Sequence, residues 1–268
     1  MSDPRAAFHA LHRPGRPLVL PNAWDHASGA ALAAAGYPAV GTTSLGVAAA
    51  AGRPDGVAAT AEETLRLAEL LVRLPVLVTV DVEAGFSDDP AAVAGYAAEL
   101  AALGVVGINL EDGRPDGCLA DPALVVAKIE AVRARVPGLF VNARTDAWWL
   151  GLPDPLEQAL PRARAYRRAG ADGVFVPGAG DPDVVRRLAD ALDAPLNVLA
   201  QPGGPSPAAL GRLGVARVST GSLLFRAALA AVVRTADAVR TGVVEPDPAL
   251  PSYAEVQRRT ATARRPSG

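Results

Sequence analysis

The sequence predicts a single α/β domain of the (β/α)8 TIM barrel class, and three observations predict it. Eight short apolar runs recur along the 268 residues, and most are followed by a stretch with helical spacing. The runs are continuously apolar rather than alternating, as in parallel strands buried on both faces. The length is close to the roughly 250 residues of such a barrel. The runner-up is an open doubly wound sheet, which usually carries a glycine-rich fingerprint after its first strand; PNAWDHASG (21–29) is not one.

The expected strands follow one another along the chain, each separated from the next by helical or loop sequence. Gly36, Gly104, Gly170 and Gly214 each follow a helical stretch and precede the next strand, as helix-terminating glycines do. The expected strands are LVLPNAW (18–24), AVGTTS (39–44), VLVTVDVE (76–83), GVVGINLED (104–112), LFVNART (139–145), GVFVPG (173–178), PLNVLA (195–200) and RVSTG (217–221).

The clearest helices between these strands are expected at 61–74, 90–104 and 154–170. No linker or low-complexity block interrupts the pattern, so we expect one barrel domain over 1–268. The polar, proline-bearing stretch 243–268 is expected to be a C-terminal appendage that packs on the barrel and has a disordered end.

The composition and net charge limit which partners and which cellular location are expected. The net charge is −2 and the isoelectric point is near 6.0, which gives no reason to expect a nucleic-acid or membrane partner. The single cysteine, Cys118, excludes an internal disulfide framework and fits a reducing cytoplasm. No apolar run approaches the ~18 residues of a membrane span, and the first residues carry no signal core. We therefore expect a cytoplasmic location.

Polar side chains gather where the expected strands end. In a barrel of this class the C-terminal ends of the strands line the active site. The residues at these ends are Asn22 and Trp24, Ser44, Asp81 and Glu83, Glu111, Asn142 and Arg144, Pro177 and Gly178, Asn197, and Ser219 with Thr220.

Four of the acids predict a metal site. Asp81 and Glu83 close one run and share a face if the strand continues through both; Glu111 closes the next run, and Asp55 follows the second run by several residues. Carboxylates that meet in one pocket repel each other or become protonated unless a cation is present. An all-oxygen ligand set suits a hard divalent ion, most often Mg²⁺.

The remaining polar groups suit a small dianionic substrate. Arg144 can hold a carboxylate in a bidentate manner, and the backbone amides around Ser44–Gly46 can hold another anionic group. A metal there would polarise a carbonyl and stabilise a developing enolate. Each residue also has a plainer alternative: the acids as turn or helix-cap residues, Arg144 as a partner of Asp146, Ser44 as a turn residue, and Cys118 as an inert thiol.

These residues, taken together and in order, match the pattern of a known superfamily. The chain resembles the isocitrate lyase/phosphoenolpyruvate mutase superfamily over essentially its whole length. The segments that carry it, in order, are PNAWDHASGAALAAAGYPAVGTTSLG, GRPDG, VDVEAGF, GINLEDG, NARTDA, GADGVFVPG and PLNVLA. The resemblance implies a (β/α)8 barrel, usually with its last helix exchanged between neighbours in a dimer-of-dimers tetramer, so we expect a homo-oligomer, a dimer or tetramer. It also implies Mg²⁺ (or Mn²⁺) and small 2-oxo acid substrates.

Position by position, the resemblance implies a role for each acid. Asp81 matches the direct metal ligand, which also brings it next to the substrate. Glu83 and Glu111 match the partners that hold metal-bound waters. Asp55, in the GRPDG loop, matches the acid near the reacting centre.

The same comparison implies the substrate contacts. Ser44, Leu45 and Gly46 match the loop that binds the oxo acid carboxylate. Arg144 matches the arginine that orients the substrate, and Asn197 matches a polar residue on the seventh strand.

The departures from the superfamily pattern are equally specific. Isocitrate-type lyases carry a Lys-Arg-Cys-Gly sequence on a mobile loop, whereas residues 112–119 read DGRPDGCL. Gly178 stands where those lyases have a Glu, Pro177 where the mutase has a His, and Thr42 where an aromatic residue is usual.

Three hypotheses follow. The first is an Mg²⁺-dependent lyase that cleaves or forms a C–C bond beside a 2-oxo carboxylate through a metal-stabilised enolate, with Asp55 and Arg144 as catalytic residues. The second is a phosphonomutase or phosphonopyruvate hydrolase. The third is an oxo-acid-binding protein with weak catalysis.

Overall fold

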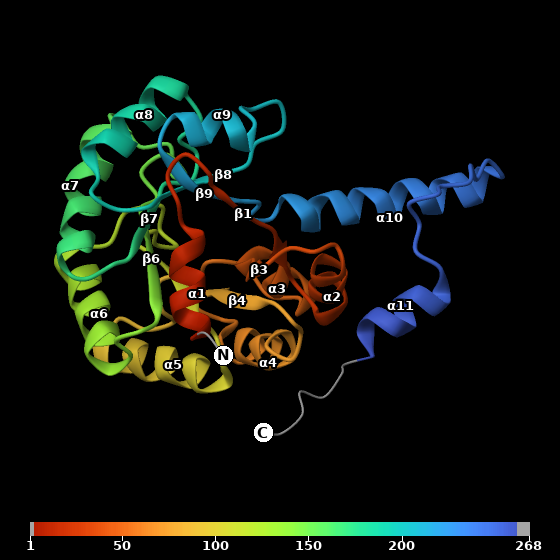
Figure 1. Ribbon diagram of the computed structural model, residues 1–268, viewed down its shortest axis with the longest axis horizontal. Coiled ribbons are helices and arrows are strands. Elements are labelled where there is room, and N and C mark those ends of the chain that lie inside the picture. Colours follow the sequence, from red (N-terminus) through yellow and green to blue (C-terminus); the bar gives the residue numbers. More distant parts are fainter. Residues whose placement is uncertain (1–2, 262–268) are drawn as a thin grey trace.

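A computed structural model describes residues 3–261 as a closed barrel of parallel strands ringed by helices (Figure 1). Within these residues the sheet has nine strands in the order β1-β9-β8-β7-β6-β5-β4-β3-β2. The strands are β1 (Leu18–Leu20), β2 (Asn22–Ala23), β3 (Ala39–Thr42), β4 (Leu77–Asp81), β5 (Gly107–Glu111), β6 (Phe140–Arg144), β7 (Gly173–Phe175), β8 (Leu196–Leu199) and β9 (Val215–Ser219). The predicted (β/α)8 class is confirmed.

The ninth strand arises because the first predicted strand is divided at Pro21, which has no backbone N–H to donate. Its first half, β1, pairs in parallel with β9, and its second half, β2, pairs with β3. One short segment therefore joins the two ends of the sheet and closes the barrel.

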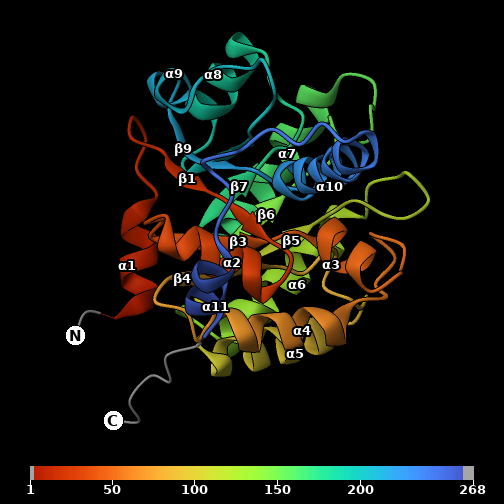
Figure 2. The same ribbon diagram turned by 90° about the vertical axis from the view of Figure 1, so that its right-hand side faces the viewer.

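Helices alternate with the strands and cover the outside of the barrel (Figures 1 and 2). They are α1 (Pro4–Leu11), α2 (His26–Ala34), α3 (Ser44–Ala50), α4 (Ala61–Leu71), α5 (Pro90–Leu103), α6 (Pro122–Arg135), α7 (Pro155–Arg168), α8 (Pro182–Ala191), α9 (Pro207–Arg212), α10 (Leu223–Thr241) and α11 (Tyr253–Thr260).

Local sequence explains where many of these helices start and stop. Five of them begin on an Asp-Pro pair, in which Pro presets the first helical φ, and in four of the five the Asp side chain accepts a hydrogen bond from the first turn. The four glycines expected to terminate helices all have φ between +88° and +106°, a region that favours glycine. The capping residues are Asp3, Asp89, Asp121 and Asp181.

The N-terminal end of the barrel is plugged. Helix α1 places Phe8 and His12 against Phe140 of β6, and the His12 and Phe140 rings stack with centroids 4.1 Å apart. This cluster also takes in Leu18 and Leu20 of β1. The barrel is therefore open at its other end, where the strands finish.

The C-terminal part of the chain leaves the barrel surface. Helix α10 projects away from the barrel, and only Phe225 of its 19 residues is buried (Figure 1). Helix α11 returns to pack beside α2, where His26 Nε2 lies 3.3 Å from the Thr260 carbonyl oxygen. The expected appendage over 243–268 thus includes α11, while its end, 262–268, lies outside the described residues.

Candidate active site

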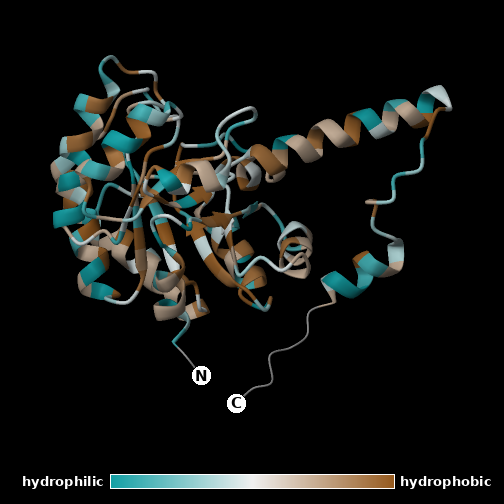
Figure 3. Cartoon of the chain, turned by 45° about the horizontal axis from the view of Figure 1, so that its top comes forward, coloured by the Kyte–Doolittle hydropathy of each residue, from teal (hydrophilic) through white to brown (hydrophobic). Residues whose placement is uncertain are grey.

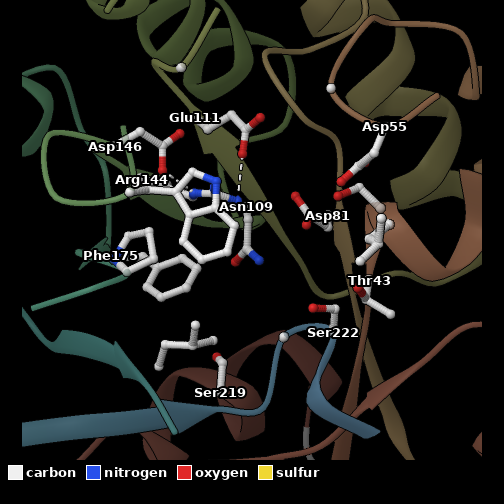
Figure 4. A pocket seen from close by; sticks show the side chains of 18 of the residues that line it. Thr43, Asp55, Asp81, Asn109, Glu111, Arg144, Asp146, Phe175, Ser219 and Ser222 are labelled. Carbon is white, nitrogen blue, oxygen red and sulfur yellow. Dashed lines mark hydrogen bonds and ion pairs between the residues drawn. The ribbon is translucent and has the colours of Figure 1, made fainter. Parts of the chain in front are cut away.

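A cavity of about 260 Å³ opens at the C-terminal ends of the strands (Figure 4). Its wall takes residues from β2, from each of the strands β4 to β9, and from the segments that follow β3, β5, β6, β7 and β9. The structure brings together six of the nine candidate site residues on this wall: Ser44, Leu45, Asp55, Asp81, Glu111 and Arg144.

Asp81 is the residue at the end of β4. Its backbone N–H donates to Thr42 Oγ1 at 2.8 Å, which fixes the strand end. Its Oδ1 is buried and has no hydrogen-bond partner within residues 3–261. Burial raises the pKa of the Asp81 carboxyl; Arg144 opposes the rise and Asp55 adds to it. A buried carboxylate oxygen without a partner is costly unless a cation or a proton satisfies it.

Arg144 lies across the cavity from Asp81 and is held by two acids. Its Nη1 lies 2.6 Å from Glu111 Oε2, and its Nε donates to Asp146 Oδ1 at 2.7 Å. The first pair follows from strand register, because Glu111 of β5 stands directly beside Arg144 of β6. Arg144 therefore pairs with Asp146, as the plainer alternative predicts, and it also lines the cavity.

Electrostatics keeps the Arg144 guanidinium charged. Burial alone would lower its pKa, but Glu111, Asp146 and Asp81 together raise it. Burial also raises the pKa of Glu111, an effect that Arg144 opposes. The rings of Trp149 and Phe175 lie 5.7 Å from the guanidinium carbon, so its open side is covered by aromatic surface.

Glu83 faces away from this cavity. Strand β4 ends at Asp81, and Glu83 has φ +50°, so the alternation of a strand no longer sets its direction. Its Oε2 accepts from the Ala58 N–H at 2.9 Å and its Oε1 from Thr60 Oγ1 at 3.0 Å. The Glu83 carboxylate thus fastens the loop that carries Asp55.

The loop after β3 ends in the first turn of α3. Thr43 precedes this helix without a side-chain cap. The Ser44 N–H donates towards the Asp81 carboxyl and opposes the rise in its pKa, while the N–H groups of Leu45 and Gly46 have no protein partner within residues 3–261. Gly46 is buried rather than part of the wall. A Cβ at Gly46 would lie 2.6 Å from Trp24 Cβ, so only glycine lets the turn pack this closely.

Asn197 lies on β8 beneath the cavity and not on its wall. Its Oδ1 accepts from Ser219 Oγ at 3.1 Å, within a buried polar layer that fills the barrel below the site. Sequence reasoning missed Asn109 and Trp149, which do line the cavity. Asn109 stands two residues before Glu111 on the same strand, so strand alternation could have found it.

The residues fit a magnesium ion with few protein ligands. Within residues 3–261 no three His, Cys, Asp or Glu side chains form a ready-made metal site. Mg²⁺ is usually bound by one or two carboxylates and keeps several waters, which suits one unpartnered oxygen on Asp81 with Asp55 and Glu111 on the same wall. Metal roles for Asp81, Glu83 and Glu111 therefore stay predictions, with the direct role centred on Asp81.

Comparison with known proteins places the chain in a family. The sequence model of the phosphoenolpyruvate phosphomutase family matches residues 8–240. A Mycobacterium tuberculosis protein described as uncharacterized is 47% identical over 253 residues, which cover 94% of this chain and 95% of the relative. An oxaloacetate decarboxylase of Paraburkholderia xenovorans is 32% identical over 75% of this chain and 70% of its own length.

A solved structure agrees with this placement. The crystal structure of 2,3-dimethylmalate lyase superimposes with a TM-score of 0.83 and 25% identity, covering 97% of this chain and 95% of the lyase. The family match spans both the strand ends and the cavity described above. The chain therefore belongs to the phosphoenolpyruvate phosphomutase family, within the isocitrate lyase/phosphoenolpyruvate mutase superfamily of barrel enzymes.

Proposed function

We propose that the protein is an Mg²⁺-dependent lyase that cleaves or forms a C–C bond next to the carboxylate of a small 2-oxo acid. The observation that carries the proposal is the unpartnered, buried Asp81 Oδ1 on the same cavity wall as Asp55, Glu111 and Arg144. An oxaloacetate decarboxylase and a dimethylmalate lyase among the similar proteins support this reaction class.

The chain's own residues would hold the substrate between two walls. In this proposal the backbone N–H groups of the Ser44–Gly46 turn donate to one carboxylate, and Arg144 orients the other end. When bound, Mg²⁺ would polarise the substrate carbonyl and stabilise the charge that develops on its oxygen. Trp149 and Phe175 exclude water from the Arg144 side of the cavity.

Asp55 is the residue proposed to move the proton. In the cleavage direction it accepts the hydroxyl proton of a 2-hydroxy diacid as the C–C bond breaks, and the enolate product then takes up a proton at carbon. Pro177 and Gly178 follow β7 and bring no titratable group there. Asp55 is therefore a carboxylate of the wall that is not paired with Arg144.

The experiment is a turnover assay on a panel of 2-hydroxy and 2-oxo diacids with Mg²⁺, with Mn²⁺ and with EDTA. We expect metal-dependent formation of a 2-oxo acid from at least one compound, and loss of that activity in Asp55→Asn. Absence of metal-dependent turnover across the panel would contradict the proposal.

P–C chemistry is the second candidate, because the matching family model is named for a phosphomutase. Phosphorus NMR on phosphonopyruvate distinguishes it: consumption of the phosphonate signal would favour this candidate. Tight oxo-acid binding without turnover on either panel would instead favour the oxo-acid-binding alternative.

The proposed assembly is a homo-oligomer, a dimer or tetramer, in which a second copy covers α10. The apolar residues Leu229, Val232, Val233 and Val239 of this projecting helix are exposed, with Val232 at 66% (Figure 3). A helix with one buried residue gains little stability alone, so packing against a partner is expected. Exchange of the last helix of the barrel between copies, and a cytoplasmic location, stay predictions.

None of the helices in the described part of the chain combines the length and the hydropathy of a membrane span. Nothing in the family match or in the described residues points to nucleic acid or a membrane as a partner. The proposed partner is a small 2-oxo acid.

A further inference from the structure

A fully buried arginine lies just beneath the cavity floor. Arg217 of β9 has no exposed surface, and within residues 3–261 no carboxylate lies within ion-pair distance of it. Its Nε donates to Ser219 Oγ at 3.0 Å and its Nη2 to Asn109 Oδ1 at 3.2 Å, while its Nη1 has no partner. Burial lowers the pKa of Arg217 to about 9, and Asp81 opposes this shift.

This arginine fixes the orientation of the Asn109 amide. A guanidinium carries only donors, so the Asn109 atom that faces it must be the oxygen. Asn142 Nδ2 donates to the same oxygen at 2.9 Å. Both contacts occupy Oδ1, and the Asn109 NH₂ group is left to point elsewhere.

The Asn109 NH₂ group points towards the cavity. Asn109 lines the cavity wall, and its Nδ2 donates to no protein atom within residues 3–261. Nor is it among the buried side-chain atoms that lack a partner, in contrast with Asn197 Nδ2. Figure 4 shows the Asn109 side chain amid the lining residues, between Glu111 and Ser219. An uncommitted donor pair therefore faces the open space.

We propose that Asn109 Nδ2 donates a hydrogen bond to an anionic oxygen of the bound acid at the cavity floor, and that Arg217 is a positioning residue that holds the amide in this orientation. The inference rests on the proposed function, which supplies a carboxylate or an enolate oxygen as acceptor. It adds a floor contact to the contacts from Arg144 and the Ser44–Gly46 turn.

The charges around Asn109 favour an anionic ligand atom at the cavity floor. Asp81 and Glu111 make the upper wall negative, and Glu111 is already paired with Arg144. Arg217 is a positive charge below the floor with no carboxylate within ion-pair distance in residues 3–261, and its field at Asn109 favours an anionic oxygen over a cation. A hydrogen bond to a charged oxygen is worth roughly a tenfold or larger factor in affinity.

The test is isothermal titration of the full-length protein with oxalate and with its monoamide, oxamate, each with Mg²⁺ and with EDTA. In Asn109→Ser, which adds no charge, oxalate should bind roughly tenfold or more weakly than in the wild type. In Asn109→Asp the donor becomes an acceptor, so the preference should shift towards oxamate, whose NH₂ can donate in return. The new carboxylate would also pair with Arg217, which favours folding.

Asn142→Ser is the matched control. It makes the same substitution in the same buried layer and removes one donor to Asn109 Oδ1, but Asn142 does not line the cavity and the Asn109 amide keeps its contact with Arg217. We expect its oxalate affinity to stay within about threefold of the wild type and its oxalate-to-oxamate preference to be unchanged. Thermal unfolding of each variant without ligand confirms that it is folded.

The outcomes separate this inference from the proposed function. Unchanged oxalate binding in both Asn109 variants, or equal losses in Asn142→Ser and Asn109→Ser, would overturn the floor contact and leave the proposed lyase standing. Failure of the wild type to bind either acid under any condition would overturn both.

Discussion

At the scale of single residues, the site is built from charges that the protein alone does not fully satisfy. Arg144 forms ion pairs with Glu111 and Asp146, whereas the Oδ1 of Asp81 has no hydrogen-bond partner within the described residues. A buried carboxylate oxygen without a partner can accept a cation, which is the role proposed for Asp81.

Asp81→Asn tests this reading. Because the neutral amide is cheaper to bury than an unpaired carboxylate, we expect the metal-free variant to be at least as stable as the wild type. We also expect the rise in melting temperature on adding Mg²⁺ to disappear. Thermal unfolding with and without Mg²⁺ measures both, and a variant that keeps the full magnesium-dependent rise would rule out Asp81 as the ligand.

Arg144→Ala should be strongly destabilising. It leaves two buried carboxylates, Glu111 and Asp146, without their cation, which typically costs about 3–5 kcal/mol. The matched control is Arg53→Ala, which breaks the half-exposed pair with Glu63 and should cost less than about 1 kcal/mol. Urea unfolding compares the two, and equal losses would contradict the role of burial.

At the scale of elements, the strand ends could be predicted from the sequence because continuous apolar runs stop where polar residues begin. This placed Asp81, Glu111 and Arg144 at one end of the barrel, and register then made Glu111 and Arg144 neighbours. The direction of Glu83 could not be predicted, because it depends on a positive φ just past the end of β4.

The positions of two further residues could not be predicted from the sequence. Trp149 lines the cavity because the segment after β6 folds over the strand ends. Such a loop path depends on tertiary contacts that have no periodic signal in the sequence. Asn197 was expected at the site, but β8 places it in the layer beneath.

Lys128, the only lysine of the chain, ties α6 to the segment after β4. Its Nζ donates to the Ala84 carbonyl oxygen at 2.9 Å and lies 3.2 Å from Asp88 Oδ1, and it is almost fully buried. We expect Lys128→Met to lower the free energy of unfolding by about 2 kcal/mol, because a buried carbonyl loses a charged donor.

The same change should also weaken magnesium binding, since the segment begins at the end of β4, where Asp81 stands. Arg135→Met, on an exposed position of the same helix, is the control and should leave both quantities unchanged. Urea unfolding and magnesium titration give the two readouts. A Lys128→Met protein as stable as the control would show that this tether contributes nothing.

At the scale of the whole molecule, the barrel is closed below by α1 and open above, and α10 leaves it to expose an apolar face. We expect light scattering to find a dimer or tetramer. The double substitution Val232→Glu and Val239→Glu should dissociate it, because both side chains are more than 60% exposed in the single chain and would be buried by a partner. A wild-type monomer at micromolar concentration would contradict the proposed assembly.

The central claim is that Asp81 at the barrel mouth holds a divalent cation beside a small oxo acid. The most direct measurement is a crystal structure of the protein with Mn²⁺ and oxalate, in which anomalous scattering locates the metal. We predict a metal peak roughly 2.0–2.3 Å from Asp81 Oδ1, with oxalate completing its coordination and facing Arg144. A metal bound elsewhere, or a cavity that holds oxalate with no metal near Asp81 at saturating Mn²⁺, would contradict the account.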